Sequence, residues 1–214
     1  MSHAFDKSYW EHHWSGTGQG HTVTAHPTAA NPHLVGEVGE LAPGTALDAG
    51  CGHGAEAVWL AARGWQVTAV DISATALRHV RRGAETVAAD VATRITWVEA
   101  DLTTWTPPQG QFDLVTTHYV HPATSHLDLL GRLAAWVAPG GTLLVVGHGS
   151  PQRENGATHM PASAVAGTAE DLVTVLDRDR WDVLVAENRL RTVSDPHGRE
   201  TTLHDVVLRA RRRP

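Results

Sequence analysis

The sequence predicts an α/β protein built on a doubly wound, mostly parallel sheet with helices on both faces. Five short apolar segments alternate with segments whose apolar residues recur every three or four positions. Strands that alternate with helices form a parallel sheet that is covered on both sides. The last two predicted strands follow one another without a helix between them, so we expect them to form an antiparallel hairpin at the end of the chain.

Helix boundaries follow from residues that begin or end helices. Asn31 followed by Pro32 begins one helix, because Pro is favoured at the first helical position. Ser73 caps another helix, and Pro139-Gly140-Gly141 ends a third. The predicted helices are 5–14, 31–41, 55–63, 73–87, 127–137 and 169–177, and the predicted strands are 45–49, 65–71, 95–98, 112–117, 143–147, 181–192 and 201–210.

The stretch from Thr45 to Gly54 organises the rest of the chain. A buried strand runs into Asp48, and glycines then stand at every second position, at Gly50, Gly52 and Gly54. Glycine is needed where φ is positive or where a ligand lies against bare backbone. The free N–H groups of the following helix would face that ligand. This pattern predicts a site for a nucleoside-like cofactor.

Carboxylates at the ends of the next strands are suited to such a cofactor. Asp71 lies 17 residues after Gly54, where a carboxylate accepts hydrogen bonds from a ribose diol. Asp101 ends the third strand and is suited to an adenine amino group. The glycines alone also fit the dinucleotide pattern of Gly50-x-Gly52-x-x-Ala55, and therefore NAD. Asp48 either anchors the turn or meets a positive ligand group.

These motifs resemble those of class I S-adenosylmethionine-dependent methyltransferases. The resemblance covers residues 31–148 and implies a Rossmann-like, seven-stranded sheet with S-adenosyl-L-methionine as cofactor. The matching stretches are Leu47–Gly54, Val70–Ser73, Glu99–Leu102, Phe112–Val115 and Pro139–Leu143. The resemblance assigns the amino-acid part of the cofactor to Asp48, Gly50, Cys51 and Gly52, the ribose to Asp71, and the adenine to Ile72, Asp101 and Leu102.

The end of the fourth strand carries the candidate catalytic residues. His118 and His121 follow this strand, and either can act as a base if the acceptor must lose a proton. His118 also counts among the cofactor-binding candidates, and Tyr119 among those for substrate. The alternative is that either histidine only packs or hydrogen-bonds. We expect no metal site, because the chain lacks a cysteine cluster and a Glu-containing zinc helix.

Residues 1–30 are predicted to form a lid over a methyltransferase domain at 31–214. An isolated short helix is marginal in water, so its aromatic residues must dock on something. We expect Trp10 or Trp14 to line the acceptor side of the site, and glycines at 16, 18 and 20 to let the segment move. The segment resembles the lid of thiopurine and tellurite-resistance methyltransferases. The alternative is a helix packed permanently on a remote face.

Composition restricts the class of protein. A chain of 214 residues is expected to form one domain core, and its single cysteine excludes an internal disulfide. The net charge of −6 argues against a nucleic-acid partner. The sequence has no apolar run of about 18 residues, which a membrane span needs, and no evident secretory signal. We therefore expect a cytoplasmic protein without a membrane partner. The sequence leaves the oligomeric state open, with a homodimer as one candidate.

The sequence therefore predicts a methyltransferase that acts on a small-molecule nucleophile: a thiol, hydroxyl, amine or inorganic anion. The absence of an Asn-Pro-Pro-Tyr motif after the fourth strand, where Thr117-His118-Tyr119-Val120 stands, disfavours a nucleobase acceptor. Two alternatives remain at this point. One is a regulatory protein that binds S-adenosylmethionine without catalysis, and the other is an NAD-dependent oxidoreductase.

Overall fold

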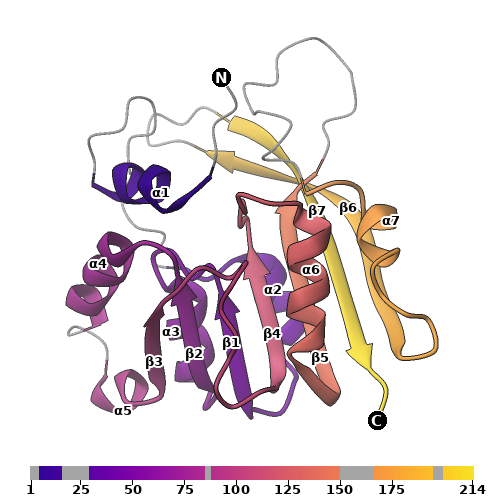
Figure 1. Cartoon of the computed structure of the whole chain (residues 1–214), viewed down its shortest axis with the longest axis horizontal. Helices are drawn as coiled ribbons and strands as arrows, with labels where there is room; N and C mark the ends of the chain where they lie inside the picture. The colour runs from indigo at the N-terminus through magenta and orange to yellow at the C-terminus, as the bar shows by residue number, and fades with distance from the viewer. Residues whose placement is uncertain (1–4, 16–28, 85–87, 150–165, 195–199) are drawn as a thin grey trace.

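The computed structural model describes residues 5–15, 29–84, 88–149, 166–194 and 200–214. One seven-stranded sheet, in the order β3-β2-β1-β4-β5-β7-β6, runs through the protein (Figure 1). β1 to β5 are parallel, and β7 pairs antiparallel with both β5 and β6. The predicted fold class is confirmed. The strands are β1 Thr45–Ala49, β2 Gln66–Asp71, β3 Ile95–Glu99, β4 Phe112–His118, β5 Val137–His148, β6 Trp181–Ser194 and β7 Glu200–Arg212.

Helices cover both faces of this sheet, because alternate residues of each strand point to opposite sides. In β1, Leu47 joins one buried cluster with α6 and α7, and Ala46 joins a second cluster with α2 and α3. Figure 1 shows α6 in front of the sheet and α2 and α3 behind it. The helices are α1 Lys7–Trp14, α2 Pro32–Val38, α3 Ala55–Ala62, α4 Ala74–Ala84, α5 Ala89–Ala92, α6 His126–Ala135 and α7 Ala169–Val173.

The fifth strand begins earlier than predicted, at Val137 instead of 143. The helix before it accordingly ends at Ala135, and residues 139–141 lie within β5, so the prediction that they end a helix was wrong. Val137 pairs with Phe112, and the register then shifts before Leu114 pairs with Thr142. Val137 lies four positions after Leu133, and an apolar residue at this position fits a helix and a strand equally well. Its pairing with Phe112 in the sheet makes it part of β5.

Other differences lie at element ends. α7 ends at Val173 instead of 177, and the short helix α5 was not predicted. Asn31 caps α2 by accepting from the N–H of His33, as expected for the Asn-Pro pair. Most of the predicted irregular stretches 16–32 and 149–167, and residue 87 of the predicted helix 73–87, fall outside the described residues.

The parallel strands end at the same edge of the sheet, and α1 lies above that edge (Figure 1). The turns after β1, β2, β3 and β4 therefore face one region from below, and the N-terminal helix faces it from above. No helix among the described residues has the length and apolar content that crossing a membrane requires.

Candidate functional site

The turn after β1 has the backbone geometry that its glycines were expected to provide. Gly50 and Gly52 have φ of 79° and 46°, in the left-handed region that favours glycine. The N–H groups of Gly50 and Cys51 both donate to the carbonyl of Val70, at 2.8 and 2.9 Å. A Cβ at Gly52 would lie 3.4 Å from the Trp14 ring of α1. The turn is thus fixed to β2 and leaves a narrow gap beneath α1.

Asp71 connects this turn to the end of β2. Its Oδ2 accepts from the N–H of Gly52 and its Oδ1 from the N–H of Ser73, each at 2.9 Å. The carboxyl group is buried, and this burial raises its pKa, although the two N–H groups act in the opposite direction. Each oxygen keeps a further lone pair, so the carboxylate can still accept from a ligand hydroxyl.

Two more acids lie beneath the turn. Asp48 is fully buried, and its Oδ2 has no hydrogen-bond partner. Burial, and then the nearby charges of Glu56 and Asp71, hold the pKa of Asp48 well above its usual range. Glu56, in the first turn of α3, accepts from the N–H of Asn31 at 3.0 Å. Asp48 therefore supports the turn from below, in a cluster of carboxyl groups.

The end of β3 provides the predicted adenine-side residues. Oδ1 of Asp101 accepts from the backbone N–H and the hydroxyl of Thr103, at 2.8 and 2.7 Å. Asp101 therefore caps its own turn, and Oδ2 remains available to a ligand. Leu102 is buried, and Ile72 is half-buried next to Asp71.

A single cavity of about 990 Å³ joins these parts. Its walls include every site residue predicted from the sequence except Asp48, which lies beneath the turn. The predicted residues on the walls are Trp10, Trp14, Gly50, Cys51, Gly52, Asp71, Ile72, Asp101, Leu102, His118, Tyr119 and His121. A volume of this size is at the upper end for small-molecule sites and accommodates a cofactor together with a second ligand.

The N-terminal helix α1 is attached to the cofactor side of the cavity. Glu11 accepts from the backbone N–H of Ala74, at 2.7 Å, and from the hydroxyl of Thr75 at the start of α4. Lys7 pairs with Glu99 at the end of β3. α1 therefore closes the cavity from above through polar contacts at its rim.

The two candidate catalytic histidines lie on the opposite side of the cavity. Among the described residues, neither ring nitrogen of His118 has a hydrogen-bond partner, nor does Nδ1 of His121. Burial, with a smaller contribution from His33, lowers the pKa of His118 to about 3. Burial, with smaller contributions from His148, His126 and His13, lowers that of His121 to about 4. Both imidazoles are therefore neutral at pH 7, and the same burial makes each a weaker base than a histidine in water.

Aromatic rings of α1, and of Phe5 just before it, lie beside His121. The ring of Trp10 lies parallel to that of His121 with centroids 6.1 Å apart, and Phe5 lies 5.2 Å away. On its other side, His121 stacks on His148 at 5.5 Å. Trp14 instead contacts His53 of the glycine turn, edge to face at 4.4 Å. Trp10 thus lies on the histidine side of the cavity and Trp14 on the cofactor side.

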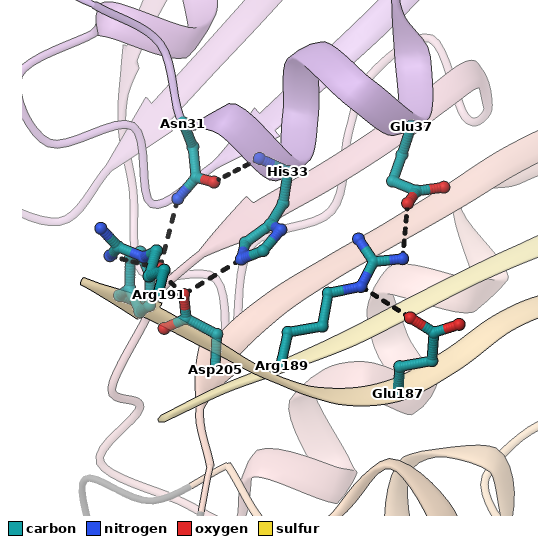
Figure 2. Close-up of polar contacts among 8 residues, drawn as sticks. Asn31, His33, Glu37, Glu187, Arg189, Arg191 and Asp205 are labelled. Atoms are coloured by element: carbon teal, nitrogen blue, oxygen red, sulfur yellow. Dashed lines mark hydrogen bonds and ion pairs between the residues drawn. The ribbon is translucent and has the colours of Figure 1, made fainter. Parts of the chain in front are cut away.

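Tyr119 takes part in a polar network that the sequence did not predict, and Figure 2 labels its partners Asn31 and Arg191. Its φ of 52° is the only positive value recorded for a non-glycine residue in the described ranges. Its hydroxyl accepts from Nη2 of Arg191 at 2.8 Å and from Nδ2 of Asn31 at 3.3 Å. Asp205, which is fully buried, accepts from Nε of Arg191 at 2.5 Å and bonds to Nε2 of His33 at 3.0 Å.

Known proteins show which family has this arrangement. A family model described as "Methyltransferase domain" matches residues 46–141. An uncharacterised methyltransferase of Mycobacterium tuberculosis is 38% identical over 147 residues, which are 67% of this chain and 72% of the relative. The chain belongs to the class I S-adenosylmethionine-dependent methyltransferases. Its cofactor is S-adenosylmethionine, and the prediction of a methyltransferase is confirmed over that of an NAD-dependent oxidoreductase.

Solved structures show the fold of this methyltransferase. TehB from Haemophilus influenzae superposes with a TM-score of 0.69 at 17% identity, over 95% of this chain and 67% of TehB. A second solved structure comes from work on the conversion of a disulfide bond into a thioacetal group during echinomycin biosynthesis. It superposes with a TM-score of 0.70 at 20% identity. That match covers 97% of this chain and 91% of the other. At these identities the likeness concerns the fold alone.

The residues present fit the cofactor of this methyltransferase family. Gly52 offers bare backbone where a side chain would fill the gap below Trp14, and Asp71 retains the acceptor capacity that a ribose diol needs. Thr103 occupies Oδ1 of Asp101, and no contact of Oδ2 is recorded among the described residues. When bound, S-adenosylmethionine supplies a methyl group that is activated by a sulfonium centre.

Sequence patterns missed several residues of the cavity wall. Glu56 and Glu99 stand within or beside the predicted motifs, so their spacing offered a signal. Phe5 precedes the predicted aromatic pair. Arg191 had no signal, because it belongs to a strand far along the chain that only the sheet brings near. Among the described residues, no group of three His, Cys, Asp or Glu side chains has the arrangement of a metal site.

Proposed function

We propose that this methyltransferase acts on a small-molecule nucleophile: a thiol, a hydroxyl, an amine or an inorganic anion. The observation that carries the proposal is the single cavity, whose walls hold the cofactor motifs on one side and Trp10, His118 and His121 on the other. α1 covers this cavity, which leaves room for a small acceptor and not for a folded macromolecule. The negative charge of the chain also disfavours a nucleic acid.

The cofactor side positions the methyl donor. We assign the amino-acid part of S-adenosylmethionine to the turn of Gly50, Cys51 and Gly52 and to the neighbouring His118. We assign the ribose to Asp71. Ile72, Asp101 and Leu102 would contact the adenine. Since the leaving group is already good, these residues accelerate the reaction mainly by orientation and by exclusion of water.

His118 and His121 are the proposed bases. Each carries a ring nitrogen without a partner in the part of the chain that the structure describes, and each imidazole is neutral at pH 7 because burial lowers its pKa. A neutral imidazole within reach of an acceptor O–H, S–H or N–H takes up the proton that methylation displaces. Tyr119 would contact the acceptor from the same loop.

Residues 1–30 are proposed to act as a lid. α1 contacts the rim through Glu11 and Lys7, and both contacts are exposed to solvent at least in part. Contacts of this kind are weak, so the helix can leave the rim to admit ligands. A homodimer and a cytoplasmic location also remain proposals, and size-exclusion chromatography with light scattering tests the first.

A panel of acceptors tests the proposed function. The full chain is incubated with S-adenosylmethionine carrying a labelled methyl group and with thiols, phenols, amines and inorganic anions. Formation of S-adenosylhomocysteine and of a labelled product is then measured by mass spectrometry. We expect one chemical class to be methylated with saturation. Methylation of RNA or protein, with none of the small acceptors methylated, would overturn the proposal. Binding of S-adenosylmethionine without any transfer would support the non-catalytic alternative for this chain.

A further inference from the structure

Arg191 reaches the cavity from the far edge of the sheet. It stands on β6, the last strand in the sheet order, and its side chain lines the cavity beside Tyr119. Nε donates to Asp205 and Nη2 donates to the hydroxyl of Tyr119. Within the described part of the chain, no acceptor is recorded for Nη1. The guanidinium therefore keeps donor capacity on its cavity side.

Three separate elements hold this guanidinium in place. Asp205 lies on β7, is fully buried and also bonds to His33 of α2. Tyr119 lies after β4, and its hydroxyl also accepts from Asn31, the cap of α2. Tyr119 takes its unusual positive φ at this point, at a cost of about 1 kcal/mol or more. An arginine fixed in this way loses little further entropy when it binds a ligand.

The position of Arg191 separates it from the cofactor motifs. Those motifs follow β1, β2 and β3, and β6 is four places from β1 in the sheet order. At about 4.8 Å per strand, the two backbones lie nearly 20 Å apart. An arginine side chain spans less than half of that distance, so it meets the loop after β4 and not the glycine turn. The guanidinium therefore lies on the side where His118 and His121 are.

The two sides of the cavity also differ in the charge of the side chains that line them. The acids on its walls lie after β1, β2 and β3 or beside α1, and these are Asp6, Glu56, Asp71, Glu99 and Asp101. The other wall cation, Lys7, pairs with Glu99 on that same side. The histidine side has neutral imidazoles, aromatic rings and the Arg191 guanidinium. That guanidinium is paired with the buried Asp205, so it offers an anionic ligand N–H donors on a side whose described walls carry no carboxylate, and not an uncompensated charge.

We propose that the methyl acceptor carries a carboxylate or a similar oxyanion, which Arg191 binds through Nη1. The aromatic rings of Trp10 and Phe5 would pack on the body of such an acceptor, with its nucleophile turned towards the cofactor. Asp205 and Tyr119 are positioning residues that orient the guanidinium. This inference rests on the proposed small-molecule function and names the acceptor's chemical class.

Paired ligands that differ only in charge test the proposal. Binding of 4-mercaptobenzoate and of its neutral amide, and of acetate, benzoate and phenylacetate with their amides, is measured by calorimetry. The protein is the full chain loaded with S-adenosylhomocysteine. We expect at least one anion to bind about tenfold or more tightly than its amide, and Arg191→Met to abolish that preference. Arg191→Lys should retain part of it.

Two further variants serve as controls. Arg189→Met removes an arginine on the same strand that pairs with Glu37 and Glu187 and does not line the cavity, so the preference should persist. The double variant R191M/D205N avoids leaving a buried carboxylate without its partner, in case the single variant does not fold. Its anion preference should also be lost. Affinity for S-adenosylhomocysteine should stay within about twofold in all variants.

Several results would overturn the proposal. One is equal binding of anions and amides, and another is an anion preference that survives in Arg191→Met and R191M/D205N. Failure of every carboxylate to bind at millimolar concentration counts against it equally. A tenfold loss of S-adenosylhomocysteine affinity in these variants would assign Arg191 to the cofactor's own carboxylate. Failure of the proposed function would give a different result. In that case calorimetry would still show the anion preference, but no small acceptor would be methylated.

Discussion

The two sides of the cavity are built in different ways. The cofactor side consists of turns directly after β1, β2 and β3, where backbone N–H groups and carboxylates meet, as at Gly52 and Asp71. The histidine side is assembled from α1, the loop after β4 and the distant strand β6. The first is local and polar, whereas the second is long-range and mostly aromatic. In the proposed function, the sheet itself would therefore hold the cofactor, and the segments around it would select the acceptor.

Gly52→Val should have the largest effect on the cofactor side. A side chain at φ 46° is strained by about 1–2 kcal/mol, and its branches would fill the gap beneath Trp14. We expect affinity for S-adenosylmethionine, measured by calorimetry, to fall about 100-fold or more, which is about 2.7 kcal/mol. Gly110→Val is the matched control, because Gly110 also has a positive φ but open space around it. Normal binding by Gly52→Val would show that the cofactor does not contact this turn.

Asp71→Ala should weaken cofactor binding by about 1–3 kcal/mol, because the ribose hydroxyls lose a charged acceptor. The backbone N–H groups of Gly52 and Ser73 also lose their partner, so the melting temperature should fall as well. Calorimetry and thermal unfolding measured together separate the two effects. An unchanged affinity in a folded variant would remove Asp71 from the site.

Deletion of residues 1–30 tests whether the histidine side depends on the lid. The deletion removes Trp10 from beside His121, and we expect turnover to fall about tenfold with a smaller loss of cofactor affinity, because water enters the site. Full activity of the shortened protein would contradict the lid. Failure to fold would favour a permanently packed helix.

A milder variant sharpens the same test. Glu11→Gln keeps the helix but weakens its attachment to Ala74 and Thr75 at the start of α4. We expect turnover to fall by no more than about threefold, since this contact is only partly buried.

The pH dependence near neutrality should be the smallest effect. His118 titrates at about 3 and His121 at about 4, so protonation of these bases should not reduce turnover between pH 6 and 8. Each folded-state pKa lies below the unfolded value of about 6.5, so the unfolded chain binds more protons between these values. The contribution of each buried, neutral histidine to the free energy of unfolding is therefore fully present above about pH 6.5. It falls by about 1.4 kcal/mol per pH unit as the pH drops below that value.

His118→Gln should reduce this acid sensitivity, measured by denaturant unfolding from pH 7 to 5. The same replacement at His79, which is exposed on α4, should leave it unchanged. A turnover profile with an acid limb near pH 6.5 would show that the base in the working enzyme does not have the lowered pKa that burial gives His118 and His121.

The fold, and the side chains that end the parallel strands, could be predicted from the sequence because their signals are contiguous. A strand, a glycine turn and a helix start fall within ten residues at 45–54, and Asp71 and Asp101 each end a strand whose apolar residues mark it. Helix or strand was ambiguous only where one residue suited both, as at Val137, which pairs with Phe112 in the sheet. There, hydrogen bonding to a neighbouring strand overrode the local periodicity.

By itself, the sequence determined the α/β class, the order of the elements and the residues that end each parallel strand, since all of these follow from local geometry. Only the tertiary structure decided what faces those residues. Lys7 meets Glu99 across 92 positions, and Arg191 meets Tyr119 across 72. No periodicity links residues so far apart. They come together because the order of the strands and the packing of α1 and α2 on the sheet bring their backbones to one edge.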